Sequence, residues 1–321
     1  MNIAVTGGGG FLGRRLALAL LQLEGVERVT LVDASKVAPF SSDRRIDLLQ
    51  ADLLSDGAVR CVAEGTDVIF HLAAVVSGQA ESDFDLGMRV NLDATRSLLE
   101  AARSGQRRPR FIFTSSLAVF GPPLPEVVTE ESAVHPGSSY GAEKAMGELL
   151  VSDYSRRGFV DGRVLRLPTV CVRPGKPNAA ASSFVSGIIR EPIAGMPANC
   201  PVGRDLELWL SSPRTAVANL VHAAFLPGDA IGSNRVVNLP GITVTVGEMI
   251  DSLGRLAGRD AAERITFNED QAVKTIVASW PARFDVTRAL ALGFSRDHSF
   301  DALIADYLAS EATIRQDGQR P

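Results

Sequence analysis

A tyrosine and a lysine four residues apart form the pair in this sequence best suited to proton transfer. Tyr140 precedes Lys144 in the segment SYGAEK. On a helix, residues four apart lie on one face, with Cβ atoms roughly 6 Å apart. An ammonium group that close favours the phenolate and lowers a tyrosine pKa that is otherwise about 10. The spacing therefore predicts that Tyr140 acts as a general base on a hydroxyl group near neutral pH, with Lys144 beside it.

A hydroxyl side chain is expected near this pair to hold the reacting oxygen atom. The segment FIFTSSLAVFG at residues 111–121 begins as an apolar run and then supplies several hydroxyl groups. We expect Ser116 to hydrogen-bond the substrate oxygen, with Ser115 as a supporting neighbour. A tyrosine four residues before a lysine is common by chance, so its significance depends on the elements that position it.

A glycine-rich loop near the N-terminus predicts a binding site for a dinucleotide. Its glycines have G-x-x-G-x-x-G spacing, and the loop lies between an apolar run and a helical pattern. Glycine allows a close approach of the backbone, so the N–H groups at the start of the helix can hold a pyrophosphate. The residues expected to bind it are Gly7, Gly10, Phe11, Leu12 and Gly13.

An acidic residue at the end of the second predicted strand indicates which dinucleotide is bound. Asp33 follows Gly13 by about 20 residues, the separation found in dinucleotide-binding folds. A carboxylate at this position hydrogen-bonds the adenosine ribose and repels a 2′-phosphate, so NAD is predicted rather than NADP. Arg14 and Arg15 could pair with a 2′-phosphate, but at the start of a helix we expect them to face solvent.

The elements that position these residues alternate between strands and helices. Apolar runs predict six strands, at residues 2–6, 28–32, 46–52, 67–71, 110–114 and 160–166. Helical patterns lie between them, at residues 11–23, 83–103 and 138–157. This alternation predicts an α/β fold with a Rossmann-type, doubly wound parallel sheet, in which ligands bind at the carboxyl ends of the strands.

The chain is expected to consist of two unequal parts. Residues 1–167 form the predicted NAD-binding Rossmann domain. Residues 168–321 are expected to form mainly a smaller C-terminal substrate-binding region, with segments that return to the Rossmann domain. Seven prolines at residues 168–213 argue against long helices there. Helical patterns follow at 246–257 and 299–309.

Composition and charge argue against several classes of function. The 321 residues carry a net charge of −4, so no basic field recruits nucleic acid, and the arginine-rich stretch 103–110 is expected to be a solvated turn. Cys61, Cys171 and Cys200 lie far apart and do not cluster with histidines, so neither disulfides nor a metal site is expected. No apolar run reaches the roughly 18–20 residues that span a bilayer, and a signal peptide is not evident. A cytoplasmic protein without membrane or nucleic-acid partners is expected.

Taken together, these motifs resemble the extended short-chain dehydrogenase/reductase family, which includes NAD-dependent epimerases and dehydratases of nucleotide sugars. Further segments extend the resemblance over nearly the whole chain: DL at 52–53, HLAA at 71–74, VN at 90–91 and DVTRA at 285–289. The resemblance implies that Asp52 and Leu53 contact the adenine. It also implies that Leu72, Ala73 and Ala74 line the cofactor.

The resemblance also implies roles close to the reacting alcohol. Asn91 is implied to help position Lys144, often through water. Dehydratases of the family carry an acidic pair beside the hydroxyl that ends the fifth strand, whereas here Leu117 and Ala118 follow Ser116. Dehydration is therefore disfavoured, because no carboxylic acid is available to protonate a leaving hydroxyl group.

Several segments in both halves of the chain resemble a branch of the family that oxidises a four-carbon sugar acid at C2 with NAD. The resemblance lies in the segments at 71–78, 83–91, 173–184 and 187–192. A guanidinium group binds a carboxylate through two parallel hydrogen bonds. We therefore expect Arg173 and Arg214 to bind the carboxylate of the substrate, and Ser77 and Asn178 to bind its hydroxyl groups.

The expected function is NAD-dependent oxidation of a secondary alcohol in a small anionic sugar acid. One alternative is an NDP-sugar 4-epimerase on the same scaffold, which would retain NAD without net reduction. Another is a non-catalytic dinucleotide-sensing regulator, although such proteins tend to lose the tyrosine or the lysine. The resemblance also implies a homodimer that pairs through the helices expected at 90–102 and 142–154.

Overall fold

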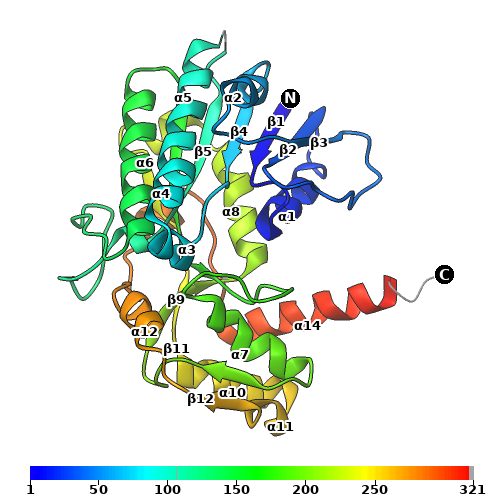
Figure 1. Ribbon diagram of the computed structural model, residues 1–321, viewed down its shortest axis with the longest axis vertical. Helices are drawn as coiled ribbons and strands as arrows, with labels where there is room; N and C mark the ends of the chain where they lie inside the picture. The colour runs from blue at the N-terminus through cyan, green and yellow to red at the C-terminus, as the bar shows by residue number, and fades with distance from the viewer. Residues whose placement is uncertain (106, 318–321) are drawn as a thin grey trace.

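Seven parallel strands form the central sheet of the upper lobe in Figure 1. The computed structural model describes residues 1–105 and 107–317, and side-chain surroundings as far as residue 310. The order across the sheet is β10 (Val236–Asn238), β6 (Asp161–Leu167), β5 (Arg110–Ser116), β4 (Val68–His71), β1 (Asn2–Thr6), β2 (Arg28–Asp33) and β3 (Ile46–Gln50). The chain order reverses between β1 and β4, which is where ligands bind in open parallel sheets. The predicted Rossmann-type sheet is thus confirmed, and the six predicted strands are all present.

Helices cover both faces of the sheet (Figure 1). One face is covered by α2 (Asp56–Ala63), α5 (Ala94–Ser104) and α6 (Ser139–Arg156). The other is covered by α1 (Phe11–Leu20) and α8 (Pro213–Phe225), which pack against each other. Both α8 and β10 come from the second half of the chain, so this half contributes to both lobes.

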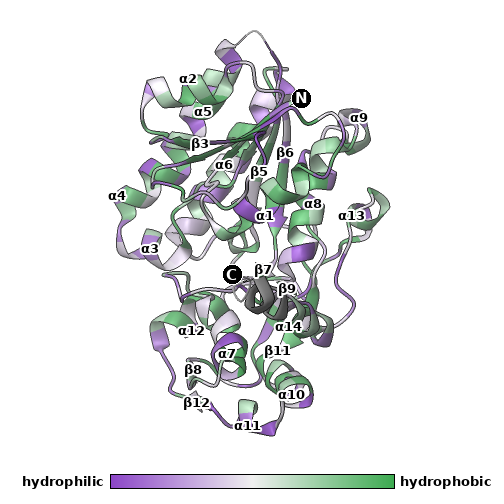
Figure 2. Cartoon of the chain, turned by 90° about the vertical axis from the view of Figure 1, so that its right-hand side faces the viewer, coloured by the Kyte–Doolittle hydropathy of each residue, from purple (hydrophilic) through white to green (hydrophobic). Residues whose placement is uncertain are grey.

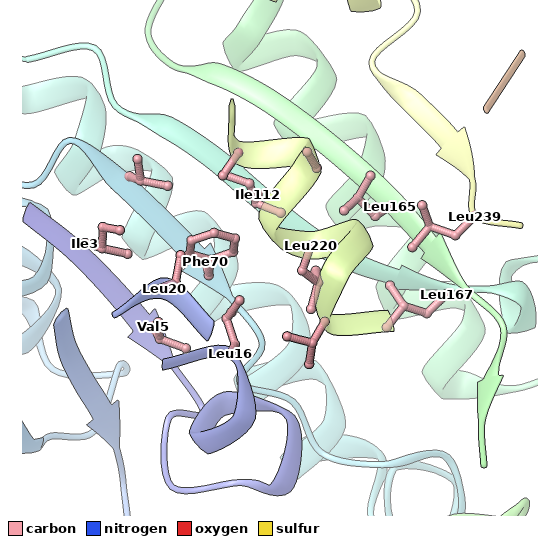
Figure 3. Close-up of a cluster of buried hydrophobic side chains, with 14 of the residues drawn as sticks. Ile3, Val5, Leu16, Leu20, Phe70, Ile112, Leu165, Leu167, Leu220 and Leu239 are labelled. Atoms are coloured by element: carbon pink, nitrogen blue, oxygen red, sulfur yellow. The ribbon is translucent and has the colours of Figure 1, made fainter. Parts of the chain in front are cut away.

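A buried apolar cluster joins the sheet to α1 and α8 (Figure 3). Its members include Ile3, Val5, Leu16, Leu20, Phe70, Ile112, Leu165 and Leu220. The inner strands β1, β4 and β5 are buried along most of their length because helices cover both faces of the sheet, and Figure 2 shows apolar (green) stretches in the sheet and in these helices. This packing fixes the carboxyl ends of β1, β4 and β5 relative to one another.

A smaller lobe lies below the sheet. It contains a three-stranded sheet of β7 (Thr169–Val170), β9 (Glu207–Ser211) and β11 (Ile242–Thr245), and a pair formed by β8 (Ala198–Cys200) and β12 (Ile265–Phe267). Around these strands lie α7 (Ser183–Ile193), α10 (Val246–Ala257), α11 (Arg259–Ala262), α12 (Gln271–Ala278) and α14 (Phe300–Asp317). The predicted helix at 246–257 is confirmed as α10, which begins with a capping box formed by Thr245 and Glu248.

Short segments connect these elements. The helix predicted at 83–103 is divided into α4 (Phe84–Gly87), the π-helical turn η1 (Met88–Asp93) and α5. The remaining short elements of the described chain are α3 (Ser77–Ser82), the 3₁₀ turn η2 (Leu117–Val119), α9 (Gly228–Ile231) and α13 (Thr287–Ala291).

The proline-rich segment between 168 and 213 contains one helix of average length. The helix α7 has 11 residues and contains only Pro192, which lies next to its last residue. Pro213 is the first residue of α8, where the missing N–H group would have no partner within the helix in any case. No long helix lies within residues 168–212, as predicted, and α7 fits there because most of these prolines fall in the loops around it.

Within the described residues, no helix is both long enough and apolar enough to cross a membrane.

Candidate active site

A cleft of about 330 Å³ lies between the carboxyl ends of the strands and the smaller lobe. From the upper lobe, the glycine loop, the end of β5 and the start of α6 line it, and they bring Ser116, Tyr140 and Lys144 together. From the other side it is lined by Trp280 and by several residues of the segment 167–182, among them Arg173, Asn178 and Ser182. Side chains that are distant in sequence therefore share one cavity.

A second hollow of about 190 Å³ continues this cleft toward β2. The two hollows share Gly7 and Ala74. The second is also lined by Asp33, Asp52 and Leu53. All residues predicted to bind the cofactor line one hollow or the other, namely Gly7, Gly10, Phe11, Leu12, Gly13, Asp33, Asp52, Leu53, Leu72, Ala73, Ala74, Tyr140 and Lys144. Together they form an elongated path of the kind that a dinucleotide needs.

The glycine loop brings backbone directly against the cleft. Gly7 has a φ of 67°, a conformation that glycine adopts without strain. A Cβ atom on Gly13 would lie 2.6 Å from the Gly7 carbonyl oxygen, so only glycine allows α1 to begin this close to the loop. Among the described residues no side chain caps the N-terminus of α1, which leaves the N–H groups of its first turn for an anionic ligand. These features fit the pyrophosphate of a dinucleotide.

Asp33 lies at the β2 end of this path, where two backbone groups hold its carboxylate. Its Oδ2 accepts a hydrogen bond from the Gly9 N–H at 3.1 Å, and its Oδ1 accepts one from the Ser35 N–H at 3.0 Å. The carboxylate therefore stands between the glycine loop and the end of β2. A negative charge fixed in this place would repel a 2′-phosphate.

The helix α6 brings Tyr140 close to Ser116 because it packs directly on the turn that follows β5. A Cβ atom on Gly141 would clash with the Ala118 carbonyl oxygen, so this contact requires glycine. The helix starts with the Ser138 hydroxyl, which accepts a hydrogen bond from the Gly141 N–H at 3.2 Å. The Ser116 Oγ accepts one from the Ala118 N–H at 3.1 Å, and Tyr140 and Ser116 are hydrogen-bonded to each other.

The environment of Tyr140 differs from the prediction that Lys144 would lower its pKa. Shielding from water raises the pKa of Tyr140 to about 12. The hydrogen bond with Ser116 and the charge of Arg173 oppose this shift, whereas the charge of Glu143 adds to it. The Lys144 Nζ lies 5.8 Å from the centroid of the tyrosine ring. Within the protein alone, burial outweighs the neighbouring positive charges.

Lys144 is itself almost completely buried, with 2% of its surface exposed. Its Nζ lies over the Phe113 ring, 4.9 Å from the centroid. Burial lowers the pKa of Lys144 to about 8, and the charges of Glu143 and Glu148 act in the opposite direction. The ammonium form therefore depends on nearby carboxylates rather than on water.

Asn91 is buried behind the cleft and does not line it. Its side chain makes two hydrogen bonds with the Val75 backbone, at 2.8 and 3.0 Å. Its remaining Nδ2 hydrogen points to the Glu143 Oε2, at 2.6 Å. The hydrogen bonds of the Asn91 side chain thus reach Glu143, the neighbour of Lys144, rather than the lysine itself.

Ser115, the predicted supporting hydroxyl, is buried and donates a hydrogen bond to Glu148. Glu148 also forms a two-pronged ion pair with Arg166, with distances of 2.9 and 2.7 Å. Because both charges are buried, each compensates the desolvation of the other. This network ties β5, α6 and β6 together directly behind Ser116.

His71 is buried and hydrogen-bonds to hydroxyl groups of β1 and α5. It is not a proton donor for the cleft. Its Nδ1 lies 2.7 Å from the Thr6 hydroxyl and its Nε2 lies 2.9 Å from the Thr95 hydroxyl. Thr95 donates its own hydrogen to the Asn91 carbonyl, so the histidine Nε2 must be the donor in their contact. Burial and the charge of Lys144 lower the pKa of His71 to about 3, so the ring stays neutral.

Arg173 lines the cleft close to Tyr140 and has no acidic partner among the described residues. It lines the cavity and is half-buried. Its charged and ionisable neighbours are Cys171, Arg190 and Tyr140, and no carboxylate of the described residues lies within 4.0 Å of its guanidinium group. Burial lowers the pKa of Arg173, because loss of water disfavours the charged form of its guanidinium group. Such a site is suited to an anionic ligand.

The structure corrects the prediction for Arg214. It does not line the cleft but is exposed at the second residue of α8, and its Nε lies 2.7 Å from an oxygen of Asp306 on α14. The hollow beside it is a different one, formed by α1, α8 and α14. The sequence places an arginine after β9, but α8 begins at Pro213 and carries Arg214 away from the cleft.

The two predicted hydroxyl-binding residues do line the cleft. The Ser77 hydroxyl accepts a hydrogen bond from the Ala181 N–H at 3.1 Å, and the Asn178 Oδ1 accepts one from the Ala180 N–H at 3.1 Å. Sequence reasoning missed Ser182 and Trp280, which also line it. Ser182 lies near Asn178 in sequence, whereas no motif connects Trp280 to the rest of the site.

The comparisons with known proteins agree with this geometry. The model of the NAD dependent epimerase/dehydratase family matches residues 3–210. A protein named D-erythronate dehydrogenase from Cupriavidus necator is 57% identical over 96% of this chain and 98% of its own length. Another of the same name, from Haemophilus influenzae, is 50% identical over 96% of this chain and 99% of its own.

A solved structure has a closely similar fold. It is described as the nucleoside-diphosphate-sugar epimerase from Agrobacterium tumefaciens and is 43% identical, with a TM-score of 0.90 over 98% of this chain and 95% of its own. The family and these relatives identify the chain as an oxidoreductase that uses a nicotinamide dinucleotide. By its matched length, its fold and the dinucleotide-shaped cleft, the chain belongs to the NAD dependent epimerase/dehydratase family.

Proposed function

We propose that this protein oxidises D-erythronate to 2-dehydro-D-erythronate with NAD. The observation that carries the proposal is Arg173, a half-buried cation without a carboxylate partner among the described residues, in the same cleft as Tyr140 and Ser116. A small sugar acid carries the carboxylate that this arginine lacks, next to the alcohol that the tyrosine requires. The substrate named for both relatives has these two groups on adjacent carbons.

In this proposal each residue of the cleft has one task. NAD, when bound, supplies the carbon that accepts the hydride. Arg173 binds the carboxylate, and Ser77 and Asn178 contact the remaining hydroxyl groups. Ser116 hydrogen-bonds the C2 oxygen, and Tyr140 accepts its proton as the carbonyl forms. Lys144 binds the ribose beside the nicotinamide, and its positive charge favours the phenolate.

NAD rather than NADP is the proposed cofactor because of Asp33. Its carboxylate is fixed by Gly9 and Ser35 in the hollow that would hold the adenosine. Two acceptor oxygens in that position suit a ribose with free hydroxyl groups. A 2′-phosphate would bring a second negative charge against them.

The test is a panel of four- to six-carbon sugar acids supplied to the purified protein with NAD or NADP. Formation of NADH is followed by its absorbance, and the product is identified by mass spectrometry. We expect the highest kcat/KM with D-erythronate and NAD. Equal rates for acids and their neutral sugar counterparts would contradict the role of a carboxylate-binding arginine.

A second candidate is an NDP-sugar 4-epimerase, which the similar structure from Agrobacterium tumefaciens favours by its description. An epimerase would interconvert UDP-sugars without net formation of NADH. Incubation with UDP-glucose or UDP-glucuronic acid, followed by chromatography of the sugars, separates the two functions. We expect no epimer to form.

We also propose that the protein acts as a homodimer that pairs through α5 and α6. These helices lie side by side on one face of the sheet (Figure 1). Leu149 on α6 has 72% of its surface exposed, the highest fraction among the large apolar side chains described as exposed. A second copy would remove this side chain from water.

A further inference from the structure

We propose that Glu143 is a positioning residue of the catalytic pair: held by Asn91, its buried carboxylate is the counter-charge that keeps Lys144 an ammonium ion. This proposal rests on the proposed role of Tyr140 and Lys144 in the reaction. It adds to that role a residue that contacts neither substrate nor cofactor.

The first observation is the place of the carboxylate. Glu143 has 1% of its surface exposed and precedes Lys144 directly in α6. Its Oε2 accepts the hydrogen bond from Asn91, and its Oε1 is buried with no hydrogen-bond partner among the described residues. An ionised carboxylate is costly to bury when one of its oxygens has no hydrogen-bond partner. A neighbouring cation is therefore needed to compensate its charge.

The second observation is the space made for this side chain. A Cβ atom on Gly87 would clash with the Glu143 Oε1, so the glycine at the end of α4 admits the carboxylate. Asn91 uses its other hydrogen bonds to bind the Val75 backbone, which fixes the amide that orients Glu143. The orientation of the Glu143 carboxylate is therefore set by Gly87, by Asn91 and by the Val75 backbone that holds Asn91, rather than by the rotamer of Glu143 alone.

The third observation is the lack of another counter-charge. Glu148, the other carboxylate near Lys144, is already paired with Arg166 through two hydrogen bonds. No carboxylate of the described residues lies within 4.0 Å of the Lys144 Nζ. Within the part of the chain that the structure describes, Glu143 has no ion pair within 4.0 Å, so its charge remains available to the lysine.

The ionisable groups that face this pair come from several elements. Glu81 on α3 adds a negative charge near Glu143, and its carboxylate accepts a hydrogen bond from the Ser139 N–H at 2.9 Å. His71 on β4 faces Lys144 and stays neutral. Burial raises the pKa of Glu143, whereas the bond from Asn91 and the charge of Lys144 favour its ionised form.

The test uses the four lysines of the chain, which are Lys36, Lys144, Lys176 and Lys274. Lysine labelled with ¹³C at Cε is incorporated into the full-length protein, and the chemical shifts are followed against pH without substrate or cofactor. A Lys144→Met protein identifies the Lys144 signal. In Glu143→Gln, which retains an oxygen for Asn91, we expect Lys144 to titrate at a pH about one unit lower than in the parent, a tenfold change in proton affinity. The other three signals should be the same in both proteins.

Two further variants make the result decisive. Glu64→Gln removes one negative charge from an exposed position and should leave the Lys144 titration unchanged. Gly87→Ala keeps the carboxylate but displaces it, so it should shift the Lys144 titration even if Glu143→Gln does not fold. Titration of Lys144 at the parental pH in each folded variant of Glu143 or Gly87 would overturn the proposal. Because the readout needs no substrate, this result is independent of whether D-erythronate is oxidised.

Discussion

At the scale of single residues, Arg173 and Arg214 allow a direct comparison of an arginine inside the cleft with one outside it. Both were predicted to bind the substrate carboxylate, but Arg173 lines the cleft and Arg214 pairs with Asp306 outside it. A hydrogen bond to a charged group contributes about 1.5–3 kcal/mol. We therefore expect Arg173→Leu to raise the KM for the sugar acid by roughly 10- to 100-fold, with the Kd for NAD nearly unchanged.

Arg214→Leu serves as the control for this measurement. It removes the same charge from an exposed site, so steady-state kinetics should give a KM within about twofold of the parent. Surface ion pairs of this kind contribute little, about 0–1 kcal/mol. An Arg173→Leu protein whose KM stays at the parental value would remove the carboxylate-binding role from this arginine.

At the scale of elements, the contact of α6 with the turn after β5 sets the distance between Tyr140 and Ser116. Gly141→Ala would force the helix away from the Ala118 carbonyl oxygen. We expect a loss of about 1–3 kcal/mol in the free energy of unfolding, typical of overpacking, and a lower kcat. Denaturant unfolding and steady-state kinetics measure the two effects.

Gly254, a glycine within α10, provides the comparison for Gly141. A Cβ atom on Gly254 in α10 would meet only the Ala262 Cβ, at the ordinary distance of 3.6 Å. Gly254→Ala should therefore stabilise the protein by roughly 0.5–1 kcal/mol and leave kcat unchanged, because alanine favours the helix. If Gly141→Ala behaved in the same way, the tight contact would not be what positions Tyr140.

The sequence allows much of this arrangement to be predicted at the element scale. The six strands and the helices at 11–20 and 139–156 follow from apolar patterns that local residues determine. Those patterns place the glycine loop, Asp33, Ser116 and Tyr140 at strand ends or helix starts, and parallel topology brings these positions to one edge of the sheet. The direction in which α8 leaves β9 is set by tertiary packing, which is why Arg214 was misplaced.

The electrostatic balance of the site could not be predicted from spacing. The i,i+4 relation of Tyr140 and Lys144 says nothing about how far each is shielded from water. In the structure, burial raises the pKa of the tyrosine and lowers that of the lysine. Glu143 and Trp280 were also missed, because burial and the packing of distant loops give them their significance.

At the scale of the whole molecule, the site requires both lobes, and the proposed dimer would rest on the face of the sheet that carries α6. Leu149→Glu should convert a dimer to a monomer, because a charge would be buried without a partner. Light scattering after gel filtration measures the mass of each protein. A parent protein that is already a monomer, or a Leu149→Glu protein that still pairs, would place the interface elsewhere or exclude it.

The proposed reaction depends above all on Tyr140, which would remove the proton of an alcohol whose hydride reduces NAD. The most direct test compares NADH formation from D-erythronate by the parent protein and by Tyr140→Phe, with the Kd for NAD measured for both. We expect the parent to form one NADH per 2-dehydro-D-erythronate. The variant should bind NAD with similar affinity but lose about 10²–10⁴-fold in kcat, the usual contribution of a general base. A parent protein that forms no NADH, or a Tyr140→Phe protein that is as fast as the parent, would contradict the account.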